Sequence, residues 1–342
     1  MRNPKNVLNS LSKHSGNSNY KFERLYRVLF NAEMFYVAYE RIYAKPGNMT
    51  AGTDGKTVSG MSIERIEQLI ESLKNETYQP APSKRAYIPK KNGKKRPLGI
   101  PSFNDKLVQE VVRMILEAIY EGSFEHTSHG FRPGRSCHTA LISIQKSFTA
   151  VKWFIEGDIK GFYDNIDHDV LIGILRERIA DERFLRLIRK FLNAGYIEDW
   201  VFHRTYSGTP QGGIISPLLS NIVLNELDWW LASQWENIPT QYPFKQTPNR
   251  NGSPNHGNKY ASLRRSGLKE ITCVRYADDF KIFTSSYPNA VKLFHATKDW
   301  LKERLGLDIS PEKSKVISLK EDYSDFLGFR IKVHKGKRNQ YV

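Results

Sequence analysis

The stretch that decides the fold lies at residues 272–284 and reads Thr-Cys-Val-Arg-Tyr-Ala-Asp-Asp-Phe-Lys-Ile-Phe-Thr. Its two ends, 272–276 and 280–284, are rich in β-branched and aromatic residues and predict two short strands. The residues between them, Ala277-Asp278-Asp279, predict a tight turn, because aspartate stabilises turns through hydrogen bonds of its own side chain. The stretch therefore predicts a β-hairpin that carries two adjacent carboxylates at its tip.

The segments on either side of this hairpin complete an α+β unit. An apolar strand is predicted at 151–159 and carries Asp158 near its end, and a last strand is predicted at 326–333. Apolar residues at three- and four-residue spacing predict helices at 217–230 and 290–305. The order strand, helix, hairpin, helix, strand is that of a split βαβ (ferredoxin-like) layer, an antiparallel sheet with helices on one face.

The amino-terminal half is predicted to be mainly helical around one basic hairpin. Helices are predicted at 21–43, from Ser62, at 105–120, at 137–148 and at 170–192 with Asp167 as its N-cap. Strands at 85–89 and 96–100 flank a turn at Asn92-Gly93. Seven basic residues and no acidic one lie between 84 and 96, which favours a polyanionic ligand over a solvated hairpin tip.

The composition indicates a globular protein that binds nucleic acid. The 342 residues include 52 Lys and Arg against 36 Asp and Glu, a net charge of +16 at pH 7, and 39% are hydrophobic. No apolar run is long enough to cross a bilayer, so we expect no membrane partner and a bacterial cytoplasmic location, with an organellar origin left open. The two cysteines, Cys137 and Cys273, form no paired motif, which argues against a disulfide framework or a cysteine-based zinc site.

Two segments are predicted to lie outside the packed core. Residues 1–22 contain four basic and no acidic residues and predict a basic mobile arm. Residues 237–267 are rich in Pro, Asn and Gly and predict an inserted loop that does not pack as a layer.

Three carboxylates are the strongest candidates for chemistry. Turn formation explains a single aspartate, but not Asp278 and Asp279 side by side, with Asp158 near them if the two strands are neighbours. A divalent cation removes this repulsion, because Mg²⁺ takes one or two carboxylates and completes its coordination with water and phosphate oxygens. Two such ions catalyse in-line phosphoryl transfer. Polymerases and nucleases both use this arrangement, so the carboxylates alone leave the choice open.

The motifs around these acids carry a resemblance to a known family. Residues 276–279 (Tyr-Ala-Asp-Asp), 158–166 (Asp-Ile-Lys-Gly-Phe-Tyr-Asp-Asn-Ile) and 208–217 (Gly-Thr-Pro-Gln-Gly-Gly-Ile-Ile-Ser-Pro) resemble three signature blocks of reverse transcriptases. Four further blocks, 48–55, 87–101, 128–136 and 326–329, resemble proteins encoded by group II introns, of the larger, mitochondrial-like type. The resemblance extends over about residues 24–333.

The resemblance implies a role for individual residues. Metal ions would be held by Asp158, Asp278 and Asp279, which are also the catalytic residues, and by Ile159. The nucleotide would be bound by Lys90, Lys91, Arg96, Gly161, Phe162, Tyr163, Gln211 and Lys313, with Lys315 as an alternative to Lys313 and the choice between Lys90 and Lys91 open. Tyr163 would exclude a 2′-hydroxyl, so that deoxynucleotides are preferred. Arg132, Arg135, Phe326 and Gly328 would contact template or primer.

The resemblance also implies an architecture and an activity. The right-hand polymerase layout predicts a basic arm at 1–23, an amino-terminal extension at 24–56, fingers at 57–152, a palm at 153–325 that contains an interleaved finger segment and the insertion 237–267, and the end of the palm at 326–342. Relatives continue into a helical thumb, whereas this sequence stops at Val342, so we expect weakly processive synthesis.

The implied activity is RNA-directed DNA polymerisation with two Mg²⁺ ions, for which Mn²⁺ substitutes. The expected partners are intron RNA, an RNA template with a DNA or RNA primer, and dNTP, and a homodimer is compatible with the sequence. The alternatives are a splicing cofactor that acts only by binding RNA, and another bacterial reverse transcriptase class, either retron or diversity-generating.

Overall fold

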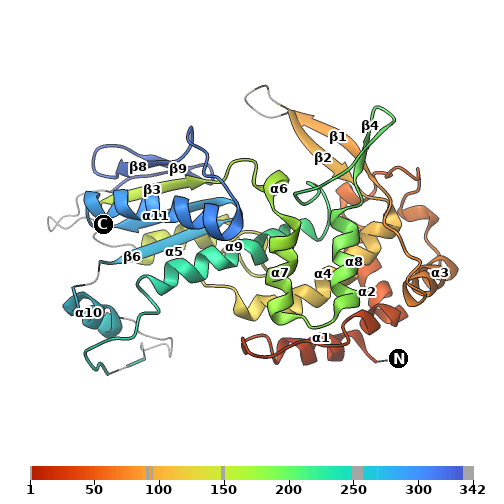
Figure 1. Ribbon diagram of the computed structural model, residues 1–342, viewed down its shortest axis with the longest axis horizontal. Helices are drawn as coiled ribbons and strands as arrows, with labels where there is room; N and C mark the ends of the chain where they lie inside the picture. Colours follow the sequence, from red (N-terminus) through yellow and green to blue (C-terminus); the bar gives the residue numbers. More distant parts are fainter. Residues whose placement is uncertain are drawn as a thin grey trace. The chain divides into compact units, whose positions relative to one another are not determined.

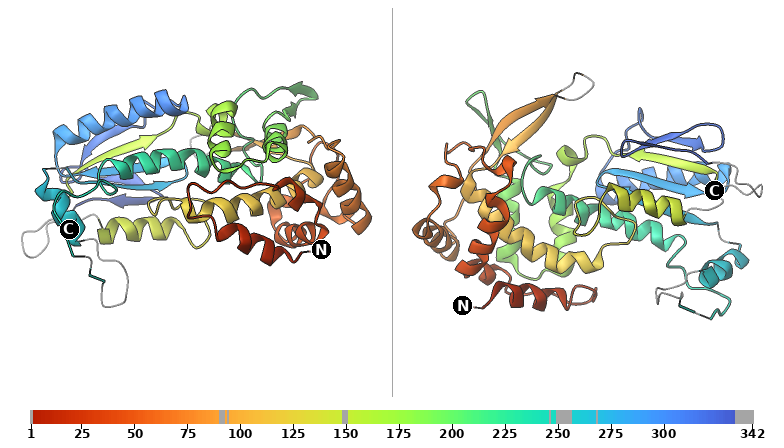
Figure 2. Two further views of the ribbon diagram at one scale, coloured as in Figure 1. Left: turned by 60° about the horizontal axis from the view of Figure 1, so that its bottom comes forward. Right: turned by 180° about the vertical axis from the view of Figure 1, so that it is seen from behind.

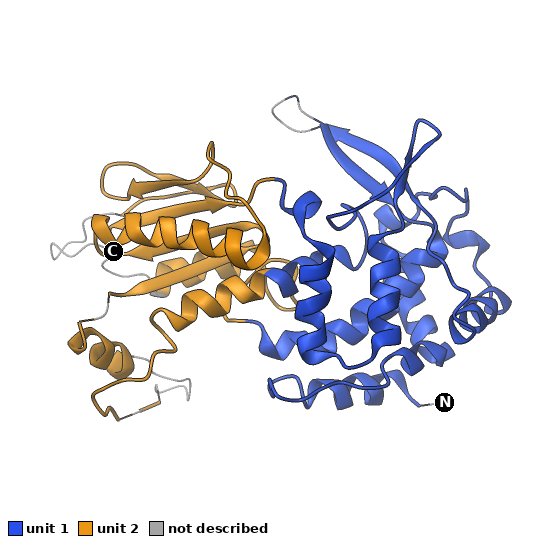
Figure 3. Cartoon of the chain, viewed as in Figure 1, with its two compact units in different colours: residues 1–124, 161–223 blue, residues 125–160, 224–342 orange. Residues whose placement is uncertain are grey.

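A computed structural model of the chain describes residues 2–89, 93, 95–147, 151–245, 247–248, 257–267 and 269–333. The chain divides into two compact units, each formed from two segments (Figure 3). Unit 1 comprises Met1–Phe124 and Gly161–Val223, and unit 2 comprises Glu125–Lys160 and Leu224–Val342. Figures 1 and 2 show the elements of each unit.

Unit 2 is built on a four-stranded antiparallel sheet. Its strands are β3 (Trp153–Asp158), β6 (Ile271–Tyr276), β7 (Asp279–Thr284) and β8 (Lys315–Ser318). They lie in the spatial order β6-β7-β3-β8, so β3 pairs with both β7 and β8. This is the strand order of a split βαβ layer, and it confirms the predicted α+β fold class.

Helices cover both faces of this sheet, and not one face as predicted, because β3 presents buried apolar side chains to both sides. On one face lie α11 (Tyr287–Leu305), where Tyr287 packs on Trp153 of β3 with ring centroids 4.6 Å apart, and the second half of α9 (Ser216–Ser233). Trp230 of α9 stacks on Trp300 of α11 at 5.3 Å. Alternate residues of a strand point to opposite faces. Phe154 therefore points to the other face, where it shares a core cluster with Ala140 of α5 (Cys137–Ser147).

Two expectations for unit 2 are corrected by the structure. The single strand predicted at 326–333 is a hairpin of β9 (Ser324–Phe326) and β10 (Phe329–Ile331), because Leu327 and Gly328 take positive φ and reverse the chain. The insertion at 237–267 is not all unpacked loop, since it contains α10 (Gly257–Arg265). Leu263 of α10 is fully buried, and the Tyr260 hydroxyl donates to Glu236 Oε1 at 3.0 Å.

Unit 1 packs helices around α4 and carries a second sheet. Its helices are α1 (Pro4–Ser12), α2 (Ala32–Tyr43), α3 (Ile63–Lys74), α4 (Phe103–Tyr120), α6 (Phe162–Asn165), α7 (His168–Arg178) and α8 (Glu182–Leu192). Short 3₁₀ turns lie at Tyr26–Phe30, Pro46–Asn48, Val58–Gly60 and Glu121–Ser123. The sheet has the order β2-β1-β4-β5, with β1 (Ser83–Pro89), β2 (Lys95–Ile100), β4 (Tyr196–Glu198) and β5 (Val201–His203).

In unit 1 two predicted helix caps are confirmed, whereas other predicted helix boundaries are wrong. The side chains of Ser62 and Asp167 cap α3 and α7 as predicted. The helix predicted at 170–192 is instead two helices, because Asp181 caps a new helix by accepting from the N–H groups of Arg183 and Phe184. The helix predicted from residue 21 likewise begins only at Ala32, after a 3₁₀ turn.

The amino-terminal segment is not a free arm. It forms α1, and the hydroxyl of the buried Ser15 donates to the carbonyl of Ile119 at the end of α4 at 2.7 Å. Phe22 is buried and exchanges backbone hydrogen bonds with the chain around Arg178. The prediction of a mobile arm failed because it rested on local composition alone, whereas these contacts are tertiary.

Among the described residues, none of the helices is both long enough and apolar enough to span a bilayer.

Candidate active site

The strand pairing of unit 2 places two of the predicted carboxylates directly opposite each other. Asp158, the last residue of β3, pairs in register with Asp279, the first residue of β7. Directly opposed side chains point to the same face of a sheet, with Cβ atoms about 4.5–5.5 Å apart. The two carboxylates therefore lie together at one end of the sheet, although they are far apart in the sequence.

The carboxylates influence one another electrostatically. Burial raises the pKa of the Asp279 carboxyl to about 6, and the negative charges of Asp158 and Asp278 contribute to the rise. Lys281 opposes it, because its Nζ lies 3.0 Å from Oδ1 of Asp279. Asp158 and Asp278 are therefore close enough to Asp279 to affect its ionisation, as expected for neighbouring carboxylates.

Asp158 is held by the segment that leads into β8. Its carbonyl accepts from the N–H of Ser310 at 2.8 Å, and its own N–H donates to Oγ of Ser314 at 3.1 Å. Lys313 lies between these two anchors, with Nζ 3.0 Å from Oδ2 of Asp158. Lys315, the alternative, instead lies 3.8 Å from Oε2 of Glu156. The structure therefore brings Lys313, and not Lys315, to the carboxylate.

These groups line a cleft of about 350 Å³ in unit 2. Its walls carry both acidic and basic side chains. They are formed by Glu156, Gly157, Asp158, Asp279, Lys281, Lys313, Lys315, Asp322, Tyr323 and Asp325.

The oxygen donors suit a hard cation that is shared with a substrate. Among the described residues, no group of three or more His, Cys, Asp or Glu side chains is arranged to hold an ion by itself. Mg²⁺ does not require such a group, because it commonly binds one or two carboxylates and completes its coordination with water and phosphate. Asp158 and Asp279 supply two such carboxylates. The adjacent Ile159 is buried and bridges to Ile309, which fixes the backbone beside them.

A buried ion pair between Arg275 and Asp228, which was not predicted from the sequence, supports the Asp278-Asp279 turn. Arg275 of β6 and Asp228 of α9 are both fully buried, with Nη2 2.6 Å from Oδ2. Nη1 of the same guanidinium donates to the carbonyl of Ala277 at 2.8 Å. The sequence could have indicated this pair, because Arg275 lies in a mostly apolar strand and Asp228 lies in a mostly apolar helix.

The block at 128–136 packs against the same turn. Arg275 exchanges backbone hydrogen bonds with Thr127 and His129, each at 2.8 Å. A Cβ atom at Gly130 would lie 2.4 Å from the backbone nitrogen of Ala277, so only glycine allows this approach. This block therefore positions the carboxylate turn.

The residues predicted to contact template or primer have structural partners in unit 2. Arg132 is buried and donates to the carbonyls of Glu125 and Ser128, and Arg135 donates to the carbonyl of His126. Phe326 is buried, and Gly328 occupies the β9–β10 turn with φ of 83°. Their contact with nucleic acid stays a prediction.

In unit 1, two of the predicted nucleotide-binding residues form a hydrogen-bonded chain with Asp164. Nε of Arg96 donates to Oε1 of Gln211 at 3.2 Å, and Nε2 of Gln211 donates to Oδ1 of Asp164 at 3.2 Å. Gly161 takes φ of 55° and is the N-cap residue of α6. Lys90 and Lys91 lie outside the described residues.

Tyr163 joins two of the signature blocks. Its carbonyl accepts from the N–H of Thr209 at 2.7 Å, and Gly208 packs so closely that a Cβ there would lie 2.6 Å from the same oxygen. Its neighbour Phe162 is buried, whereas Tyr163 is half-buried and lines a pocket of about 370 Å³ together with Gln211.

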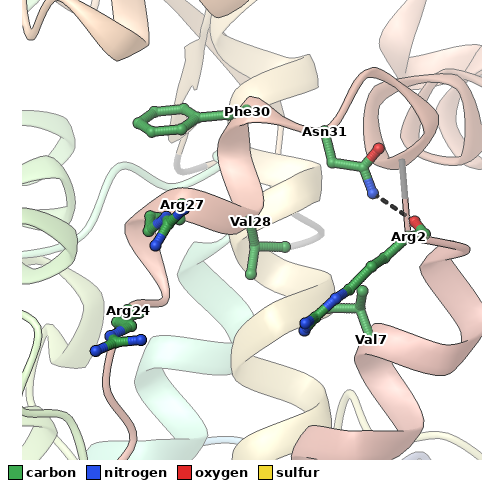
Figure 4. Close-up of a pocket in the computed structure, with 7 residues that line it drawn as sticks. All are labelled: Arg2, Val7, Arg24, Arg27, Val28, Phe30 and Asn31. Atoms are coloured by element: carbon green, nitrogen blue, oxygen red, sulfur yellow. Dashed lines mark hydrogen bonds between the residues drawn. The ribbon is translucent and has the colours of Figure 1, made fainter.

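A separate pocket of about 470 Å³ in unit 1 is basic (Figure 4). Arg2, Arg24 and Arg27 line it with Val7, Val28, Phe30 and Asn31. In the part of the chain that the structure describes, none of the three guanidinium groups is engaged in an ion pair. Arg24 takes φ of 57°, an uncommon conformation for a residue other than glycine.

Comparison with known proteins identifies the family of the chain. Residues 88–331 match the family described as reverse transcriptase (RNA-dependent DNA polymerase). Group II intron-encoded protein LtrA of Lactococcus lactis subsp. cremoris is 43% identical, with 96% of this chain and 60% of that protein aligned. An uncharacterized 91 kDa protein in the cob intron of Schizosaccharomyces pombe is 40% identical, with 96% and 44% aligned.

The chain thus spans about three-fifths of the length of the first relative and less than half of that of the second. Apo telomerase from Candida tropicalis, truncated from its C-terminal domain, aligns with a TM-score of 0.48 and 14% identity over 83% of this chain and 61% of that one. The chain belongs to the reverse transcriptase family, and it resembles a group II intron-encoded protein over 96% of its length.

Proposed function

We propose that the chain is an RNA-directed DNA polymerase that extends a primer 3′-hydroxyl with deoxynucleotides on an RNA template. The observation that carries the proposal is the direct opposition of Asp158 and Asp279 on the two central strands of the sheet. The family match supports the same reaction.

Reverse transcriptases as a family use divalent metal ions. In our proposal two Mg²⁺ ions, for which Mn²⁺ substitutes, are held by Asp158, Asp278, Asp279 and the carbonyl of Ile159. They would supply charge neutralisation for the attacking and leaving oxygens. Asp158 and Asp279 would orient the ions, because the pairing of β3 with β7 fixes the backbone of both residues.

Other side chains would bind and select the nucleotide. Arg96 would bind phosphate oxygens, together with Lys90 or Lys91, and Gln211 would contact the sugar and base. Tyr163 would leave no room for a 2′-hydroxyl. Lys313 would donate a proton to the departing pyrophosphate, which its position beside Asp158 supports.

Incorporation of labelled dTTP on poly(rA) primed with oligo(dT) tests the activity. We expect Mg²⁺-dependent incorporation by the wild-type chain and none by Asp158→Ala. Binding of the primed template by this variant should stay within about twofold of wild type, because Asp158 is one acidic residue in a strongly basic chain. No incorporation by the wild-type chain, or equal loss of binding and incorporation in the variant, would contradict the proposal.

We propose RNA binding as a second function, which assists intron splicing and mobility. The arginine pocket of unit 1 supports it, because its three guanidinium groups have no carboxylate partner among the described residues and suit phosphate oxygens. The double variant Arg24→Ala, Arg27→Ala should weaken binding of a group II intron RNA. The salt dependence of the RNA affinity should fall by an amount that corresponds to about two phosphate contacts.

The matched control is the double variant Arg186→Ala, Arg189→Ala in the same unit. These arginines are already paired with Glu76 and Asp169, so RNA affinity should change little. Equal effects of the two double variants would show a general dependence on charge and would exclude a specific role for the pocket.

A further inference from the structure

Lys281 is a buried lysine in the immediate surroundings of the proposed metal ligands. It lies two residues after Asp279 on β7, so the two side chains share a face of the sheet. Its side chain is only 6% exposed, and Nζ lies 3.0 Å from Oδ1 of Asp279. A buried ammonium needs compensation by negative charge, and Asp279 provides it.

A second carboxylate lies within reach of the same ammonium. Glu156 pairs directly with Lys281 across β3 and β7, and its Oε1 is 3.9 Å from Nζ. Glu156 is itself buried and accepts a hydrogen bond from the hydroxyl of Ser324. The ammonium therefore has two carboxylates to pair with, of which one is a proposed metal ligand and the other is not.

Aromatic rings surround the ammonium as well. Nζ lies 5.6 Å from the ring centre of Phe154 and 5.4 Å from that of Phe326. Both rings belong to buried residues, and cations are attracted to ring faces at such distances. The Lys281 ammonium is therefore surrounded by two aromatic rings and two carboxylates.

Lys313 provides the contrast. It lies at the same distance of 3.0 Å from the other opposed aspartate, Asp158, but its side chain is 66% exposed. Water and salt screen that pair and allow the lysine to leave. Lys281 has no such freedom, and its charge stays close to the carboxylates.

We propose that Lys281 is a positioning residue that holds the Asp279 carboxylate in place before a metal ion binds and passes to Glu156 when the ion arrives. This inference rests on the proposed metal site. Its consequence is that the metal affinity of the protein is lower than the three aspartates alone would give, because the ion must displace a resident positive charge.

The test is Mn²⁺ binding to the full chain without nucleotide, measured by titration calorimetry and by the electron paramagnetic resonance signal of free Mn²⁺. Lys281→Met keeps the length of the side chain and removes the charge. It should bind Mn²⁺ about tenfold more tightly than wild type, the scale of one partly screened charge next to the ion. Unchanged or weaker binding would overturn the proposal.

Three further variants separate this role from simple packing. Lys281→Arg retains the charge and should bind Mn²⁺ with an affinity close to that of wild type. Glu156→Gln removes the alternative partner and should weaken Mn²⁺ binding, because the ammonium then has only Asp279. Lys315→Met removes an exposed charge beside Glu156 and should leave the affinity within about twofold. An increase in the Mn²⁺ affinity of Lys281→Arg as large as that of Lys281→Met, or no effect of Glu156→Gln on the affinity, would overturn the proposed transfer.

Melting temperatures add a readout that does not depend on activity. Metal-free Lys281→Met should melt below wild type, because Asp279 then lacks its counter-charge, and Mn²⁺ should raise its melting temperature by more than it raises that of wild type. Asp279→Asn distinguishes a failure of the proposed metal site from a failure of the proposed role of Lys281. If it binds Mn²⁺ as wild type does, the proposed metal site fails, whatever Lys281 does.

Discussion

Arg275 and Asp228 form an ion pair in which both side chains are fully buried, and the same guanidinium also donates to Oγ of Ser128 and to the carbonyl of Ala277. The pair connects β6, α9 and the turn that presents Asp278 and Asp279. A buried charge pair often adds little net stability, but the loss of one partner leaves an uncompensated charge. Its role is to fix the position of the turn.

Asp228→Asn should therefore lower the free energy of unfolding by about 3–5 kcal/mol. Chemical denaturation in the presence of chelator measures this change. The double variant Asp228→Asn, Arg275→Met should lower the free energy of unfolding by less than the sum of the two single variants, because neither charge is then left without a partner. Additive losses would show that the two residues are not coupled.

Gly130→Ala should destabilise the protein by about 1–3 kcal/mol, because the added methyl group overlaps with the backbone of Ala277. Gly173→Ala is the matched control. It lies within α7 with no atom within 4 Å of the added Cβ, so it should be neutral or stabilising by up to about 1 kcal/mol. Similar melting temperatures for the two variants would contradict the packing described for the block at 128–136.

Tyr163→Ala should relax the rejection of ribonucleotides. Removal of the ring opens space beside the sugar, so the ratio of kcat/KM for dTTP over UTP should fall by about tenfold or more. Tyr206→Ala is the control, because this residue lines the same pocket but is 80% exposed. An unchanged ratio in Tyr163→Ala would remove the proposed role of this side chain.

Mn²⁺ binding should depend on pH around the raised pKa of Asp279. Metal ions bind the ionised carboxylate, and burial moves its pKa from the ordinary value near 4 to about 6. The affinity should therefore be full above pH 7 and fall as pH drops, by about tenfold at pH 5. Calorimetric titrations at several pH values measure this profile. Asp279→Asn should abolish the step between pH 5 and 7, and a wild-type step near pH 4 would show that the carboxyl is not shifted.

Local sequence signals determined the elements and the chemical groups of this protein. The apolar segments, the Ala277-Asp278-Asp279 turn and the caps Ser62 and Asp167 are all encoded within a few residues, because they depend on backbone conformation and short-range hydrogen bonds. The same is true of the signature blocks, whose residues are close together in the chain.

Only the tertiary structure decided which of these groups meet. Strand register sets Asp158 opposite Asp279 and places Glu156 opposite Lys281, and the path of the chain before β8 brings Lys313 to Asp158 while Lys315 meets Glu156. The pairing of Arg275 with Asp228 and the packing of Gly130 on Ala277 have the same origin. These contacts join residues far apart in the sequence, and their energies come from burial and from charge compensation in a shared core, which no local propensity contains.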